Sequence, residues 1–187
     1  QGVNMMVESE AALRAGLKSL ALDLSDSQIR QLLDYQDLIA KWTKVYNLTA
    51  VRDPAEMLTH HLLDSLAAVP PLQKHLMSGG LRSRVGDGAK LLDVGSGAGL
   101  PGVVLAICCP ALSVTCVDTV GKKAAFITQA ALSLGLRNLK GLHARVETIA
   151  ESFDVICSRA FASLADFTAW SGKALASDGV WMALKGR

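Results

Sequence analysis

Residues 90–109 combine three features that together allow few folds. Lys90–Val94 is a short, largely apolar segment typical of a buried strand, Gly95–Gly99 places three glycines at alternate positions, and Gly102–Cys109 has helical character. Glycine lets the backbone turn tightly from a strand into a helix and lets a ligand approach without a Cβ in the way. A strand, a glycine-rich turn and a helix in this order predict the first unit of a parallel α/β sheet.

The chain beyond residue 111 continues the same alternation of short apolar segments and helical ones. Strands are expected at Leu112–Asp118, Gly141–Val146, Phe153–Ser158 and Gly179–Leu184, with helices at Gly121–Leu134 and Leu164–Ala176. Such alternation predicts right-handed βαβ units and a parallel sheet with both faces covered. We therefore expect a doubly wound, mostly parallel α/β domain over residues 90–187. Because the sequence stops directly after the fifth strand, we expect C-terminal strands to be missing.

The first 71 residues have a different, helical pattern. One helix is expected at Val7–Leu22, a second after the capping box formed by Ser25 and Gln28, and a third from Pro54 to the Pro70-Pro71 pair. The second helix has an apolar face with helical spacing, made of Leu32, Tyr35, Ile39, Trp42 and Tyr46. We expect an N-terminal helical cap over residues 1–77 and a polar, glycine-rich linker over residues 78–89.

Composition excludes several classes of protein. Half of the 187 residues are hydrophobic and 19% are charged, so a disordered chain is excluded. The window Val94–Val117 contains no charged residue, but glycine and proline interrupt it. Its apolar runs are too short to span a membrane. No signal-peptide pattern begins the sequence, and the four cysteines show no CxxC spacing. We expect a soluble, cytoplasmic protein with reduced cysteines and no metal site.

The acid at the end of the second strand indicates the kind of cofactor. Asp118 lies 21 residues beyond Gly97, where a carboxylate can accept both hydroxyls of a ribose. Asp93, two residues before the first glycine, would repel a pyrophosphate but suits a ligand with a sulfonium and an amino group. No Tyr-x-x-x-Lys pair is present for hydride chemistry. S-adenosylmethionine is therefore favoured, and a nicotinamide-dependent oxidoreductase is the weaker alternative.

A set of motifs along the chain carries a family resemblance. They are Asp93-Val-Gly-Ser-Gly-Ala-Gly-Leu-Pro-Gly102, Lys122-Lys123, Ala144-Arg145-Val146-Glu147, Ser158-Arg159-Ala160-Phe161-Ala162-Ser163 and Ala183-Leu184-Lys185-Gly186, preceded by Trp42–Thr49 and His61-Leu62-Leu63-Asp64-Ser65. From about Tyr35 to Gly186 the chain resembles the RsmG (GidB) family of bacterial guanine-N7 methyltransferases of small-subunit ribosomal RNA. The resemblance implies a Rossmann-like class I methyltransferase fold and a 16S rRNA substrate.

The resemblance also implies roles for individual residues. It implies cofactor contacts at Gly95, Leu100, Val146, Glu147 and Arg159, to which the glycine-loop and ribose arguments add Gly97 and Asp118. Arg145 and Lys185 match basic positions of the family's active face. Arg159 and Lys185 are the expected catalytic residues and would hold the base or nearby phosphates. Substrate contacts are expected at Arg145, Lys122 and Lys123. Residues 119–146 contain five Lys and Arg residues and no acid, a pattern typical of phosphate binding.

The chemistry expected from these residues is methyl transfer by alignment. The Asn/Asp-Pro-Pro-Tyr motif of exocyclic-amine methyltransferases is missing after the fourth strand, and Cys157 is not part of a Pro-Cys pair. Guanine N7 has a free lone pair, so no general base is needed, and alignment alone supplies up to about 7–11 kcal/mol. His60, His61 and Asp64 have helical spacing, for which we expect a helix-surface or capping contact rather than a metal site. We expect a monomer; the alternative function is a non-catalytic ribosome-assembly factor.

Overall fold

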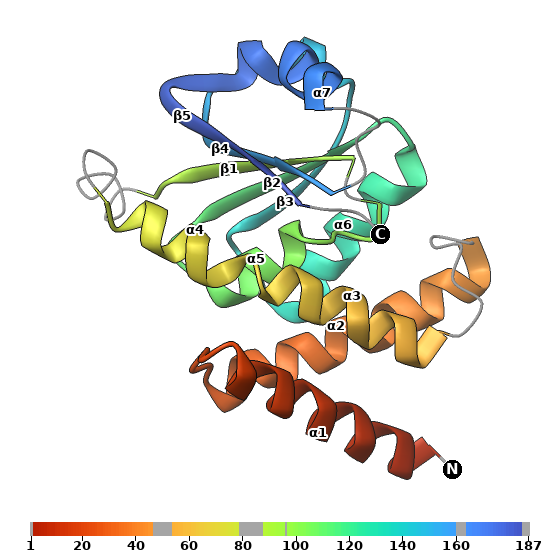
Figure 1. Cartoon of the computed structure of the whole chain (residues 1–187). Helices are drawn as coiled ribbons and strands as arrows, with labels where there is room; N and C mark the ends of the chain where they lie inside the picture. The colour runs from red at the N-terminus through yellow and green to blue at the C-terminus, as the bar shows by residue number, and fades with distance from the viewer. Residues whose placement is uncertain (1, 47–53, 79–87, 96, 160–163, 185–187) are drawn as a thin grey trace.

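The computed structural model describes residues 2–46, 54–78, 88–95, 97–159 and 164–184 (Figure 1). Its centre is a sheet of five strands: β1 (Lys90–Val94), β2 (Ser113–Asp118), β3 (Leu139–His143), β4 (Phe153–Ser158) and β5 (Leu175–Ala183). The strands pair in parallel in the order β3-β2-β1-β4-β5. The predicted doubly wound parallel sheet is confirmed, and the bounds of β1 and β4 are those expected from the sequence.

Helices cover both faces of the sheet (Figure 1). On one face lie α5 (Gly102–Cys108) and α6 (Gly121–Leu134), and on the other lies α7 (Leu164–Ser171). Side chains alternate between the two faces along each strand, so Leu91 packs into the core beneath α5 and its neighbour Leu92 into the core beneath α7. Every residue of α5 is buried, because a further layer of helices covers it.

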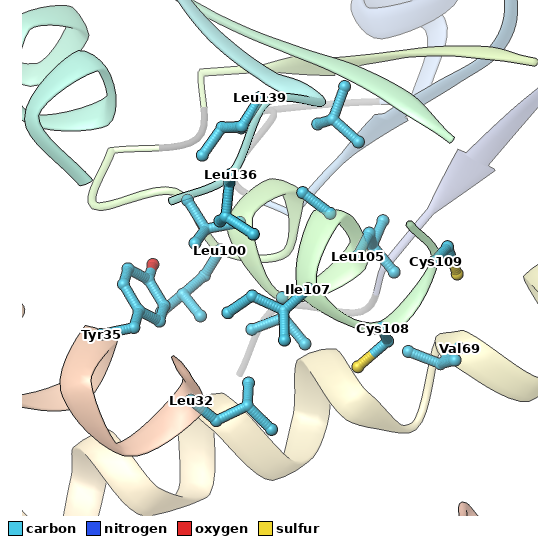
Figure 2. Close-up of a cluster of buried hydrophobic side chains, with 14 of the residues drawn as sticks. Leu32, Tyr35, Val69, Leu100, Leu105, Ile107, Cys108, Cys109, Leu136 and Leu139 are labelled. Carbon is cyan, nitrogen blue, oxygen red and sulfur yellow. The ribbon is translucent and has the colours of Figure 1, made fainter. Parts of the chain in front are cut away.

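That further layer consists of the N-terminal helices α1 (Gly2–Ser19), α2 (Asp26–Tyr46), α3 (Pro54–Leu66) and α4 (Val69–Leu76). The capping box is confirmed: the Gln28 amide donates to Ser25 Oγ at 3.1 Å, and the Ser25 amide donates to Gln28 Oε1 at 2.9 Å. Leu32, Tyr35 and Ile39 of the expected apolar face are at most 1% exposed. They pack with α4 and α5 in one apolar cluster (Figure 2).

Other expected boundaries differ from the structure. The Pro70-Pro71 pair does not end a helix, because α3 ends at Leu66 and both prolines lie in the first turn of α4, where a missing N–H costs nothing. The third strand is earlier than expected, at Leu139–His143, because its register is fixed by pairing with Val114–Asp118 of β2. The fifth strand begins at Leu175, so the helix expected to reach Ala176 ends in a 3₁₀ turn at Ala174.

Within the described ranges, no helix has both the length and the apolar character needed to cross a membrane. The expected linker at residues 78–89 lies mostly outside the described residues, whereas the third helix begins at Pro54, as expected.

Candidate cofactor-binding site

The order of the strands fixes where a ligand binds. The chain runs from β1 outward through β2 to β3 and then returns to place β4 on the other side of β1, so the direction of winding reverses between β1 and β4. In open parallel sheets, ligands bind outside the carboxyl ends of the strands at such a reversal. Gly95 follows β1 and Arg159 follows β4, so both lie at this point.

The glycine loop has the conformation of a ligand cradle. Gly95, Gly97 and Gly99 all have positive φ, of 67°, 57° and 95°, which non-glycine residues rarely adopt. A Cβ at Gly95 or Gly97 would meet no atom within 4 Å, so this side of the loop is open. A Cβ at Gly99 would instead come within 2.4 Å of Val103 and 2.7 Å of Ile127. The loop is thus packed against α5 and α6 on one side and open on the other.

Asp118, at the end of β2, closes one side of the cradle. Its Oδ2 accepts from the Gly97 amide at 3.3 Å and its Oδ1 accepts from the Val120 amide at 2.8 Å. Asp118 is 8% exposed and lies at the edge of the loop, where its carboxylate oxygens can accept further hydrogen bonds. A carboxylate in this place fits the two hydroxyls of a ribose, as the sequence predicts.

Asp93, on β1, lies beneath the loop rather than in it. Its Oδ2 accepts from the Gly102 amide at 2.7 Å, and its Oδ1 has no hydrogen-bond partner in the described part of the chain. Burial raises the pKa of Asp93 from 3.8 to about 7, with the charge of Asp118 adding to the rise. A Cβ at Gly102 would lie 2.7 Å from Asp93 Oδ2, so the glycine permits this close approach. Asp93 therefore anchors the start of α5 from below.

Arg159 is held by two side chains that sequence reasoning did not join to it. Its Nη2 contacts His61 Nδ1 and lies 3.6 Å from Asp64 Oδ2, both on α3. Only 15% of the Arg159 side chain is exposed, so the ion pair is partly shielded from water. His61 and Asp64 therefore face β4 of the sheet rather than forming the expected helix-surface pair. The spacing of three residues indicated a shared face, but nothing in the sequence identified the partner.

The other predicted site residues differ in exposure. Leu100 and Val146 are 8% and 6% exposed and pack into the two apolar cores, so contacts from them to a ligand would come from the backbone. Glu147 is exposed in a 3₁₀ turn, Val146–Thr148, after β3, and the exposed Arg145 precedes that turn. Lys185 lies outside the described residues.

The basic segment at residues 119–146 is divided by the fold. Lys122 and Lys123 begin α6 at the edge where the strands end, and Arg145 follows β3 at the same edge. Arg137 follows α6 and Lys140 is the second residue of β3, so they lie at the opposite edge, about 20 Å away along a helix of 14 residues. Of the five basic residues in this segment, Lys122, Lys123 and Arg145 share an edge with the glycine loop.

The described residues contain no group of three or more His, Cys, Asp or Glu side chains that could hold a metal ion. All four cysteines are buried thiols, and burial raises the pKa of Cys108 to about 12 and that of Cys109 to about 11. These thiols are therefore core side chains in this structure.

The fold is the Rossmann-like fold of the S-adenosylmethionine-dependent methyltransferases. A crystal structure of coclaurine N-methyltransferase bound to N-methylheliamine and SAH has a similar fold, with a TM-score of 0.50 at 15% identity over 95% of this chain and 58% of that one. A family model for GidB, rRNA small subunit methyltransferase G, matches residues 28–187. The chain belongs to this family.

Close relatives agree with that assignment. The chain is 76% identical over 178 residues to "Ribosomal RNA small subunit methyltransferase G" of Polaromonas sp. (strain JS666 / ATCC BAA-500), which covers 95% of this chain and 77% of the relative. It is 72% identical over 177 residues to the protein of the same name from Polaromonas naphthalenivorans (strain CJ2), covering 95% and 78%.

Proposed function

We propose that this protein transfers a methyl group from S-adenosylmethionine to N7 of a guanine in 16S ribosomal RNA. The observation that carries the proposal is the open cradle formed by Gly95, Gly97 and Asp118 at the reversal of the sheet, in a chain of the GidB family. When bound, the cofactor supplies an electrophilic methyl group on a sulfonium. The names of the curated relatives support ribosomal RNA of the small subunit as the substrate.

The protein's own residues bind and orient the reactants. The Asp118 carboxylate would accept from the ribose, and the glycine loop would let the cofactor approach the backbone closely. Arg159, fixed at the end of β4 by His61 and Asp64, would contact the cofactor or the base without moving a proton. Because N7 carries a free lone pair, alignment of the two reacting atoms is the main contribution required of the protein.

The positions of the basic residues support an RNA substrate at the same edge. Lys122 and Lys123 occupy the first turn of α6, where the helix dipole disfavours positive charge. That cost is offset if the two lysines contact phosphate, and Arg145 extends the same basic edge. Guanine N7 faces the deep, narrow major groove of A-form RNA, so an accessible loop or an unstacked base is the expected substrate.

The experiment is to incubate the protein with 30S subunits or deproteinised 16S RNA and methyl-labelled S-adenosylmethionine. N7-methylguanine makes the RNA chain cleavable by borohydride and aniline, so the modified nucleotide is located directly. Label at a cleavable guanine is expected. Binding of S-adenosylhomocysteine without label in the RNA would favour the assembly factor, and binding of NAD alone would favour an oxidoreductase.

Substitutions of the predicted site residues test their roles. Arg159→Ala is expected to weaken S-adenosylhomocysteine binding or turnover by about tenfold to a hundredfold. Unchanged values for both would show that Arg159 is not part of the site.

The double variant Lys122→Gln with Lys123→Gln should weaken RNA binding. It should also lower, by about two, the slope of log affinity for RNA against log salt concentration. Arg137→Gln with Lys140→Gln makes the same change of charge at the opposite edge and should alter both much less.

We further propose that the protein acts as a monomer in the cytoplasm. A sedimentation mass near twice 19.7 kDa at assay concentrations would contradict the monomer.

A further inference from the structure

A buried polar contact from the N-terminal helices supports the glycine loop. Tyr35, on α2, donates its hydroxyl hydrogen to the carbonyl of Ala98, the residue between Gly97 and Gly99. Tyr35 is fully buried and Ala98 is 4% exposed, so water cannot replace this bond. Burial raises the pKa of Tyr35 well above its usual value, which keeps the phenol protonated and able to donate.

The other contacts of α2 fix where that hydroxyl lies. Gln28 donates to the Ile107 carbonyl at 3.0 Å and Gln31 donates to the Leu134 carbonyl at 2.9 Å, so α2 binds the last turns of α5 and α6. Two turns beyond Tyr35, Trp42 packs edge-on against Phe126 of α6, with 5.3 Å between ring centroids. Helix α2 is therefore held in register on both sides of Tyr35.

Other hydrogen bonds of the loop lie on either side of Ala98, at the Gly97 amide and the Gly99 carbonyl. Gly97 and Gly99 both have positive φ, and glycine permits many backbone conformations of similar energy. A loop that samples these conformations must be ordered before it can bind a ligand, which weakens the affinity. Figure 2 shows Tyr35 reaching from α2 to the side of Leu100, the residue that follows the three glycines.

We propose that Tyr35 is a positioning residue of the cofactor site, which holds the glycine loop in its binding conformation through the Ala98 carbonyl. The inference rests on the proposed function, in which this loop binds S-adenosylmethionine. It assigns the N-terminal helices a part in cofactor binding, although none of their side chains is required to touch the cofactor.

The test compares Tyr35→Phe with Ile39→Val. Tyr35→Phe keeps the ring and removes the hydroxyl, whereas Ile39→Val removes one methyl group from the same buried face, away from the loop. Calorimetry below both unfolding temperatures should show S-adenosylhomocysteine binding about fivefold to tenfold weaker in Tyr35→Phe and unchanged in Ile39→Val. In turnover, KM for S-adenosylmethionine should rise by the same factor while kcat at saturation stays unchanged.

Each outcome distinguishes this inference from the proposed function. A lower unfolding temperature in Tyr35→Phe with unchanged affinity would mean that the tyrosine is merely structural, and would overturn the inference alone. Failure of the unaltered protein to bind S-adenosylhomocysteine would overturn the proposed function and the inference with it.

Hydrogen exchange gives a second measurement that needs no ligand. The amide of Val103 donates to the Gly99 carbonyl at 2.7 Å and reports on the loop. It should exchange about fivefold faster in Tyr35→Phe, while the amide of Leu92 in β1 keeps its rate. Equal acceleration at both amides would indicate global destabilisation and would count against the inference.

Discussion

The buried Asp93 carboxyl makes the stability of this protein depend on pH in an unusual direction. Its pKa is about 7 in the folded chain, raised from 3.8 mainly by burial. Between these two values the folded state binds a proton that the unfolded state releases, so this group's contribution to stability is greatest below about pH 3.8 and is lost as pH rises through about 7. The perturbation that isolates this effect is Asp93→Asn, which keeps an acceptor for the Gly102 amide and cannot ionise.

The magnitude follows from the shift. Raising the pKa from 3.8 to about 7, at about 1.36 kcal/mol for each tenfold change in affinity for the proton, amounts to about 4 kcal/mol in full. Between pH 5 and pH 8, across which the unfolded state is ionised and the folded state releases its proton, Asp93 should cost the wild-type protein about 3 kcal/mol of unfolding free energy. Groups that do not interact with Asp93 titrate equally in the Asp93→Asn variant, so their effects cancel in the difference.

The assay is urea unfolding of both proteins at pH 5, 6, 7 and 8. The absolute stability of Asp93→Asn is not the readout, because its buried amide has its own hydrogen-bonding requirement. The readout is the change in the difference between the two proteins, which should favour the variant by about 3 kcal/mol more at pH 8 than at pH 5. A difference that stays constant across the four pH values would refute the assignment of a raised pKa to Asp93.

Three further predictions concern the helices and the loop. Ser25→Ala removes half of the capping box and should lower the urea unfolding free energy by about 1 kcal/mol, with no loss expected if the cap is unimportant. Gly99→Ala places a Cβ 2.4 Å from Val103 at a φ of 95° and should abolish measurable S-adenosylhomocysteine binding; wild-type affinity would contradict the loop geometry. Leu105→Ala, on the fully buried α5, should lower the unfolding free energy by about 2–5 kcal/mol, and a loss below about 1 kcal/mol would show that α5 is not packed as described.

The sequence predicted most of the fold because its local signals and its packing agree. The bounds of β1, β4 and α6 follow from apolar runs bracketed by glycine or polar residues. The edge strand β3, Leu139–His143, lies earlier than the sequence predicts, because only Leu139 of its five residues is buried and the strand carries little apolar pattern of its own. Its position is set by pairing with β2, which periodicity does not report.

Site residues that share a local sequence pattern could be predicted, but contacts between distant parts of the chain could not. The glycine loop and Asp118 carry a recognisable spacing, and the structure brings them together at 3.3 Å. The contacts of Tyr35 with Ala98 and of His61 with Arg159 join residues 63 and 98 positions apart, which no local pattern encodes. A tyrosine on an apolar helix face is nevertheless a signal, because a buried hydroxyl needs a partner.

The domain boundary expected at residues 78–89 remains a prediction. The architecture changes there from helices to a sheet, yet the apolar core continues across it: Leu32 and Val69 pack in the same cluster as Leu105 (Figure 2). A cut at this position would separate the two sides of one core.

The burial of α5 also has a consequence for synthesis. During translation the helices α2 and α3 are complete more than 30 residues before α5 begins at Gly102. At about 5–20 residues per second, the nascent chain carries the apolar face of Leu32 and Ile39 for several seconds before its permanent cover exists. The order in which this chain is made therefore leaves that apolar face uncovered for a few seconds, and such transiently exposed surface is prone to aggregation.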